Sequence, residues 1–209
     1  MPTQTAESQS KLSPKEAIEL LKEGNNRFVN REMRERDLMA QVEATASGQF
    51  PFACVVGCID SRVPVTSVFD QGIGSLFVAT VAGNIINEDI LGSLEFGCAV
   101  AGSKAVVVLG HTSCGAVKGA CDHVELGNLT SLLSKINASV METTEPSDAS
   151  IRNSSNIGFV NQVAENNVRR SVQNIRIKSN VLRRLEEEGK IAIVGAMYNV
   201  DSGIVSFLD

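Results

Sequence analysis

The sequence lacks long basic segments, and its basic residues are outnumbered by acidic ones. It contains 19 Lys and Arg against 24 Asp and Glu, which gives a formal net charge of -5. The longest runs of basic residues are the pairs Arg169-Arg170 and Arg183-Arg184. Because proteins bind nucleic acid through clustered positive charge, this composition argues against a nucleic-acid partner.

Long apolar segments are also missing. The apolar runs, such as residues 105–110, are far too short to span a bilayer, so we expect no membrane partner. The first residues, MPTQTAESQSKL, are polar and contain no apolar export segment. We therefore expect a cytoplasmic protein in which residues 1–12 are disordered.

Cysteine occurs five times, and this odd number does not favour a disulfide framework. In a cytoplasmic chain such residues are typically free thiols or metal ligands. Three of them lie in apolar surroundings, where we expect them to be buried as small apolar side chains: Cys54, Cys98 and Cys121.

The order of predicted elements indicates the fold. Ser13-Pro14-Lys15-Glu16 is typical of a helix start, because serine caps the helix and proline fits its first position. Four runs that are apolar on both faces predict buried parallel strands, at residues 52–57, 75–79, 104–109 and 191–197. Further helices are predicted at about 37–47, 64–70, 87–101, 114–126, 128–142 and 156–188.

Strands that alternate with helices predict an α/β fold, with a mainly parallel central sheet flanked by helices. A turn at Asp201-Ser202-Gly203 predicts that residues 204–208 return as an antiparallel edge strand. The polar segment 143–156 is predicted to be a loop, because no second core follows it. We therefore expect a single domain over residues 13–209.

Two predicted strands end on residues that carry chemistry. The first runs into Cys58 and Asp60, and the third runs into His111 and Cys114. Ligands bind beyond the carboxyl ends of strands in open α/β sheets, so these side chains can converge. Two thiolates and one imidazole suit Zn²⁺, and three protein ligands leave its fourth position for water or substrate. An alternative is a nucleophilic cysteine with His111 as its base, which leaves the second cysteine without a role.

Asp60 and Arg62 stand beside the first of these candidate ligands. On a protein surface such a pair stabilises the fold by less than about 1 kcal/mol. Close to a metal it has a second use, because an aspartate held by arginine keeps a lowered pKa and stays ionised. It can then accept a hydrogen bond from metal-bound water. Released from Arg62, the same carboxylate could bind the metal and close the site.

The motifs GCIDSR, at residues 57–62, and HTSCG, at residues 111–115, resemble the paired motifs of the β-class carbonic anhydrases. The resemblance extends over most of the chain, from SPKEAIELLKEGNNRF to GAMYNVDSGIVSF. It implies a zinc enzyme that interconverts CO₂ and bicarbonate through attack by zinc-bound hydroxide. It also implies a dimer or tetramer in which a protruding N-terminal helix packs on the neighbouring subunit.

The resemblance assigns roles to individual residues. One Zn²⁺ per subunit would be held by Cys58, His111 and Cys114, and Asp60 with Arg62 would form the catalytic dyad. Two further residues resemble substrate-pocket positions: Gln71 in FDQGIG, which would reach the pocket from the partner subunit, and Gly115 beside the metal. The segment Ala82-Gly83-Asn84 matches a turn that follows the family's second strand.

One position departs from the family pattern. Thr80 stands where the family commonly has an arginine, which in some bacterial relatives binds a regulatory bicarbonate together with a tryptophan and a tyrosine. This chain has no tryptophan, and its one tyrosine is Tyr198. We therefore expect no bicarbonate switch between Thr80 and Tyr198.

Two other functions share the same ligand set. The first is hydrolysis of carbonyl sulfide or carbon disulfide, since both are linear and electrophilic like CO₂. The second is a non-catalytic zinc-binding paralogue, for which the Asp60-Arg62 pair would have no use.

Overall fold

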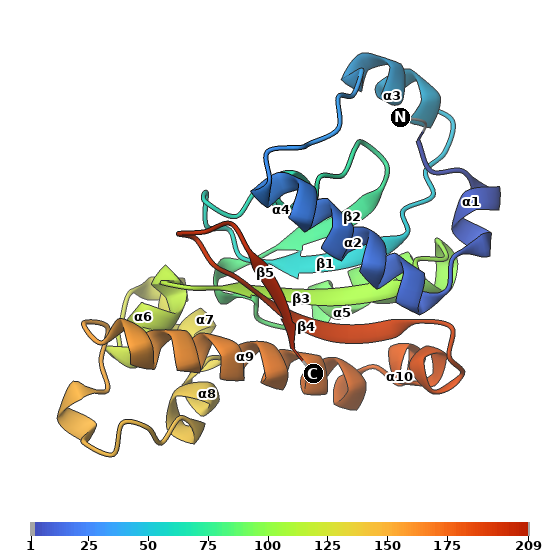
Figure 1. Ribbon diagram of the computed structural model, residues 1–209. Coiled ribbons are helices and arrows are strands. Elements are labelled where there is room, and N and C mark those ends of the chain that lie inside the picture. The colour runs from blue at the N-terminus through green and yellow to red at the C-terminus, as the bar shows by residue number, and fades with distance from the viewer. Residues whose placement is uncertain (1–2, 209) are drawn as a thin grey trace.

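The computed structural model describes residues 3–208 and shows the predicted α/β architecture (Figure 1). Its five-stranded sheet has the order β2-β1-β3-β4-β5. The first four strands are parallel neighbours, and β5 is antiparallel to β4, which confirms the expected edge strand. The strands are β1 (Ala53–Gly57), β2 (Leu76–Thr80), β3 (Ala105–His111), β4 (Ala192–Tyr198) and β5 (Val205–Leu208).

Helices cover both faces of the sheet, which explains why the central strands are apolar throughout (Figure 1). On one face, α2 (Pro14–Val29) and α4 (Val65–Val68) pack against alternate strand residues such as Val55 and Val107. On the other face, the intervening residues, such as Val56 and Val108, meet three helices. These are α5 (Glu88–Glu95), α9 (Ile157–Lys178) and α10 (Asn180–Glu187).

Two long predicted helices are each divided in the structure. Residues 156–188 form α9 and α10 because the Ser179 hydroxyl accepts from the Leu182 amide and starts a second helix. The same hydroxyl donates to Glu95 at 2.6 Å, which fixes the break against α5. Residues 128–142 likewise form two helices, α7 (Gly127–Ser134) and α8 (Asn137–Glu142), and α5 continues into a π-helical turn, Phe96–Val100.

The N-terminal segment differs from the expectation of disorder. The described part of residues 1–12 contains helix α1 (Ala6–Lys11). Thr5 caps this helix, because its hydroxyl accepts from the Ser8 amide. The buried Gln9 amide then donates to the carbonyls of Pro51 and Ala101, each at 2.8 Å. This long-range anchoring explains the order, whereas Met1 and Pro2 lie outside the described residues.

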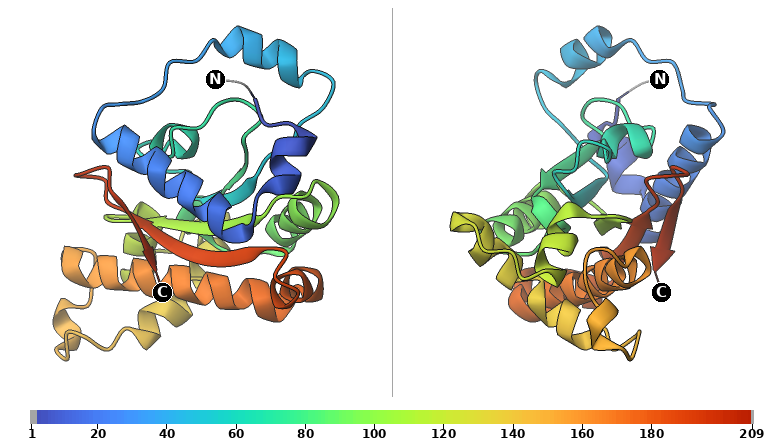
Figure 2. Two further views of the ribbon diagram at one scale, coloured as in Figure 1. Left: turned by 45° about the vertical axis from the view of Figure 1, so that its right-hand side comes forward. Right: turned by 90° about the vertical axis from the view of Figure 1, so that its left-hand side faces the viewer.

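One N-terminal helix stands away from the body of the molecule. It is α3 (Leu38–Thr45), which both views in Figure 2 place at the end of two extended connections. Three of its apolar side chains are exposed, with Leu38 at 54%, Met39 at 67% and Val42 at 44%. The helix faces the loop before β2 through Gln41, whose side-chain oxygen accepts from the Ile73 amide, and through Thr45, whose methyl group lies close to Gly74.

Three short helices, α6 (Gly115–Cys121), α7 and α8, follow β3 in the chain. They lie beside the start of α9 (Figure 1). The predicted loop 143–156 joins α8 to α9 and contains one 3₁₀ turn, Ala149–Ile151. Over residues 3–208, no helix combines the length and the apolar character needed to cross a bilayer.

Candidate metal centre

The three candidate ligands converge at the carboxyl edge of the sheet. Cys58 directly follows β1, His111 ends β3, and Cys114 caps the start of α6. Because β1 and β3 are parallel neighbours, their ends deliver these residues to one place. One sulfur or nitrogen atom from each lies within 4.8 Å of the others, and all three side chains are buried. The predicted convergence is therefore confirmed.

The His111 ring is oriented for metal binding. Its Nδ1 lies 2.9 Å from the Thr112 carbonyl oxygen, which can only accept, so Nδ1 carries the proton. Its Nε2 is buried and has no hydrogen-bond partner among residues 3–208. Buried polar atoms are nearly always partnered. A cation held between this nitrogen and the two sulfurs satisfies Nε2, so the donor set fits Zn²⁺.

The two sulfur atoms are placed to share negative charge. Cys58 Sγ accepts a hydrogen bond from the Gly83 amide at 3.3 Å. The neighbouring Cys114 thiol, aided by this amide, lowers the pKa of Cys58 to about 4 against the opposing effect of burial. The pKa of Cys114 is raised, first by Cys58 and then by burial. Two neighbouring thiolates repel each other. A divalent cation bound by both would offset this repulsion and favour the deprotonated form of each cysteine.

Asp60 and Arg62 form a tight pair whose carboxylate faces the centre. Arg62 donates from Nε to Asp60 Oδ1 at 2.9 Å and from Nη2 to Oδ2 at 2.7 Å. These bonds are the main reason that the pKa of Asp60 is lowered to about 2. Asp60 Oδ2 also lies 3.9 Å from His111 Nε2. An ionised acceptor therefore stands beside the position that a metal would take.

Two asparagines of α9 support the loops of this centre, and the sequence analysis did not identify them. Asn161 Oδ1 accepts from the Ser113 amide at 2.9 Å. Asn167 Nδ2 donates to the Gly83 carbonyl at 2.8 Å, and only 3% of Asn167 is exposed. A buried amide on the apolar face of a long helix is the signal that could have pointed to Asn167.

The two predicted substrate-pocket residues lie in different places. Gly115 begins α6 directly after Cys114, and a Cβ added there would meet open space. Gln71 instead donates to the Phe69 carbonyl at 2.9 Å. It lines a separate cavity of about 230 Å³ with Phe52 and Ser75, which precede β1 and β2. Within one subunit, Gln71 is thus not brought to the metal cluster.

Thr80 and Tyr198 are also apart within the subunit. Thr80 ends β2 and is exposed, whereas Tyr198 ends β4 and is buried. Strands β1 and β3 lie between them, so about 14 Å of sheet separates the two backbones. The absence of a bicarbonate switch at these residues stays a prediction.

The turn that supports Cys58 requires glycine. Gly83 has φ of 67°, and an added Cβ would lie 2.7 Å from Ile136 Cδ1. We expect Gly83→Ala to lower the free energy of unfolding by more than the ~1–2 kcal/mol of left-handed strain alone. Denaturant titration would measure this change. Gly189→Ala is the matched control, because its φ is also 67° but its Cβ would meet nothing within 4 Å. Equal losses in both variants would contradict the packing contribution.

Comparison with known proteins places this fold and site in a family. The family model described as carbonic anhydrase matches residues 53–205. Carbonic anhydrase 2 of Mycobacterium tuberculosis is 34% identical over 192 residues, which cover 91% of each chain. The chain belongs to the β-class carbonic anhydrase family.

Solved structures agree with this assignment. The β-carbonic anhydrase CafA of Aspergillus fumigatus aligns with a TM-score of 0.71 and 28% identity, covering 93% of this chain and 90% of CafA. A structure of tetrameric β-carbonic anhydrases from Sordaria macrospora shares the fold, with a TM-score of 0.72 and 23% identity. That alignment covers 81% of this chain and 90% of the other.

Proposed function

We propose that the protein catalyses the reversible hydration of CO₂ to bicarbonate and a proton, with one Zn²⁺ per subunit. The observation that carries this proposal is the buried, unpartnered His111 Nε2 facing two cysteine sulfurs and the Asp60 carboxylate. Membership of the carbonic anhydrase family supports the same reaction.

The metal would be held by Cys58, His111 and Cys114. A zinc ion bound there would act as a Lewis acid and would lower the pKa of a water molecule. The Thr112 carbonyl fixes the His111 ring with Nε2 directed inward. The Gly83 amide stabilises negative charge on the Cys58 sulfur. These contacts would orient two of the three ligands toward a common position.

Asp60 and Arg62 act on the substrate side of the centre. The carboxylate is ionised and offers a hydrogen-bond acceptor that orients the attacking water. Arg62 has two roles, because its fork keeps the carboxylate directed inward and keeps it charged. A purely structural metal site has no use for such an acceptor, so the pair argues against a non-catalytic paralogue.

Removing the Arg62 charge should raise the pKa of Asp60. Arg62 stabilises the charged carboxylate, so the lowered pKa of about 2 should rise toward the ordinary value of about 4 in Arg62→Gln. At pH 4.5 we then expect about a quarter of Asp60 to be protonated in the variant and almost none in the wild type. Carbon-13 NMR of the Asp60 carboxyl in metal-free protein measures this fraction. An Asp60 resonance that stays at the same position at pH 4.5 and pH 7 in the variant would contradict the role of Arg62.

The substrate is tested by stopped-flow hydration of CO₂, with carbonyl sulfide and carbon disulfide assayed in parallel. We expect CO₂ hydration to be by far the fastest of the three reactions. Faster release of sulfide from either sulfur compound would favour the alternative hydrolase. No reaction with any of them, in fully zinc-loaded protein, would favour the non-catalytic paralogue.

We further propose that the subunits associate as a dimer or tetramer, with Gln71 serving a partner's pocket and Gly115 leaving room for substrate. The exposed apolar side chains of α3 support association, because exposed apolar clusters commonly mark interfaces. A cytoplasmic location is supported by the five cysteines, which are buried and form no disulfide.

A further inference from the structure

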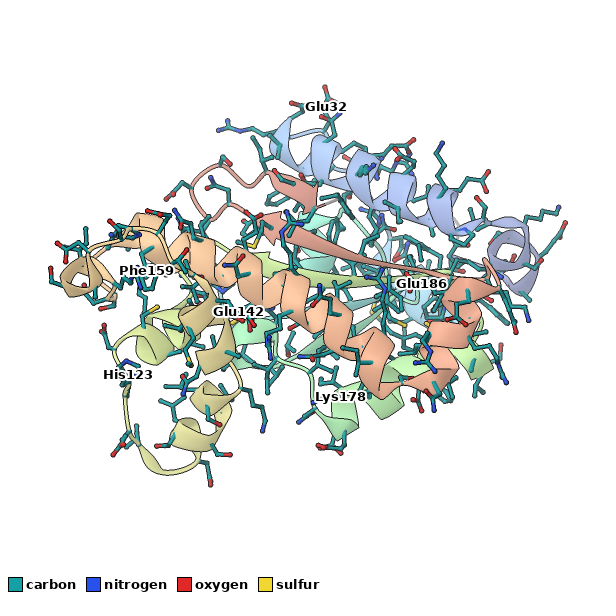
Figure 3. All side chains as sticks on the ribbon, turned by 90° about the horizontal axis from the view of Figure 1, so that it is seen from below. Glu32, His123, Glu142, Phe159, Lys178 and Glu186 are labelled. Atoms are coloured by element: carbon teal, nitrogen blue, oxygen red, sulfur yellow. The ribbon has the colours of Figure 1, made fainter. Side chains whose placement is uncertain are left out.

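Helix α9 lies along the sheet and carries three asparagine side chains that contact other parts of the chain. Figure 3 looks onto this helix, with Phe159 near its beginning and Lys178 at its end. Asn161 and Asn167 each hold a loop of the metal centre. Asn166 instead donates to Thr143 Oγ1 at 2.8 Å, at the end of α8. Asn161 and Asn167 thus contact the metal centre. Asn166 makes a comparable hydrogen bond away from it and can serve as a control.

The depth of α9 against the sheet is fixed next to Asn167. A Cβ added at Gly110 would lie 2.4 Å from Val168 Cγ2, and one at Gly195 would lie 2.7 Å from Val168 Cγ1. Val168 therefore packs directly against the backbone of β3 and β4, which is possible because Gly110 and Gly195 have no side chain. Because Gly110 directly precedes His111, the helix is held rigidly beside the strand that delivers this ligand.

Asn167 acts on the Cys58 side of the centre. Its Nδ2 donates to the Gly83 carbonyl, and the Gly83 amide donates to Cys58 Sγ. Gly83 is buried and has a left-handed φ of 67°, a conformation that glycine adopts readily but does not favour over others. The buried asparagine holds the carbonyl on the C-terminal side of Gly83, whereas the amide that donates to the sulfur lies on its N-terminal side. It therefore restrains the Gly83 backbone torsions that connect the two peptide groups, and through them the direction of the amide.

Asn161 acts on the side of the catalytic pair. Its Oδ1 accepts from the Ser113 amide, and Ser113 is a non-glycine residue with φ of 56°. A serine in this left-handed conformation is strained, and the conformation persists only where the surrounding structure holds it. The Ser113 carbonyl, in turn, lies 3.4 Å from Arg62 Nη2. Asn161 thus stabilises the turn that gives Arg62 a contact besides Asp60.

We propose that Asn161 and Asn167 are positioning residues of the enzyme, with divided roles. Asn167 sets the amide that donates to the Cys58 sulfur, and so governs how firmly the metal is held. Asn161 sets the Ser113 turn, and so governs the orientation of Arg62. The role of Asn161 in turnover rests on the proposed function, whereas the role of Asn167 in metal retention does not.

The first experiment measures metal retention. We expect Asn167→Leu, which removes the donor but fills the same space, to release zinc to excess EDTA about tenfold faster than the wild type. The cobalt-substituted variant should also show a shifted thiolate-to-cobalt charge-transfer band. Asn166→Ala should change neither. If Asn167→Leu does not fold, Asn167→Ser is measured in its place. Wild-type release rates and cobalt spectra in the folded variant would overturn this part of the proposal.

The second experiment tests whether Asn161 acts through Arg62. We expect Asn161→Ala to retain its zinc but to lower kcat/KM about tenfold. In an Arg62→Ala background the same change should cost less than twofold, because the residue it positions is gone. Asn166→Ala should leave kcat/KM unchanged in both backgrounds. Equal losses in both backgrounds, or loss of zinc from Asn161→Ala, would overturn the proposed link.

A third measurement does not depend on catalysis. In Asn161→Ala we expect the Arg62 Nε–Hε resonance of the zinc-loaded protein to shift and broaden, since the guanidinium loses a fixed neighbour. An unchanged resonance would contradict the link between Asn161 and Arg62. Because this signal and the zinc release rate are independent of CO₂, failure of the positioning roles is distinguishable from failure of the proposed reaction.

Discussion

Cys58→Ser abolishes zinc retention and reduces CO₂ hydration to the uncatalysed background; this is the largest effect that we expect from a single substitution. The serine hydroxyl is a poor zinc ligand beside a thiolate, and only His111 and Cys114 remain to hold the ion. The shorter serine side chain also replaces the thiolate that accepts from the Gly83 amide with a neutral hydroxyl. Metal analysis after desalting, together with a stopped-flow assay, measures both losses.

The matched control is Cys121→Ser, because Cys121 is equally buried and packs in the same apolar cluster without joining the metal centre. We expect this variant to keep one zinc per subunit and its activity, even if its stability falls. Full zinc occupancy in Cys58→Ser, or equal zinc loss in both variants, would refute Cys58 as a ligand.

The second large effect is expected from Asp60→Asn. Its amide has nearly the shape of the carboxylate but carries no charge, and one end of it donates rather than accepts. We expect kcat to fall at least about a hundredfold, because a positioned proton acceptor typically contributes 10²–10⁴-fold. Zinc should be retained, since Asp60 is not among the three convergent ligands. Stopped-flow kinetics and metal analysis on the same preparation separate the two effects.

Asp201→Asn is the control for the loss of charge alone. Asp201 contributes an electrostatic interaction to Arg62 but makes no hydrogen bond to it. We expect this variant to lose less than threefold in kcat, in line with a screened surface charge. If Asp60→Asn behaved in the same way, the carboxylate would not orient the attacking water.

Much of the fold could be predicted from apolar runs and turn residues. Each predicted parallel strand overlaps an observed one, because short apolar runs with β-branched residues are recognisable. The prediction that all four are buried was wrong for β2, which lies at the edge of the sheet and is partly exposed. The convergence of Cys58 with His111 also followed from strand order, since parallel strands deliver their ends to one edge. Local patterns sufficed here because local sequence and tertiary packing favour the same structure.

Other features depend on contacts between distant residues and were missed. The polar segment around Gln9 looked disordered, yet it is ordered by carbonyls at Pro51 and Ala101. Ser179 looked like one more helical residue, because neither glycine nor proline marks the break there. Asn161 resembles a surface residue of an amphipathic helix, and its partner Ser113 lies 48 positions away. No local pattern encodes such pairings.

The burial of every cysteine has a practical consequence for probing the molecule. All five thiols are buried, and none is more than 6% exposed. A cysteine introduced on the exposed face of α3, for example in place of Met39, would therefore be the one readily accessible thiol. A fluorophore or spin label could be attached there without first removing the native cysteines. Labels on α3 would then report whether this helix contacts a second subunit, while Cys58 and Cys114 stay unmodified.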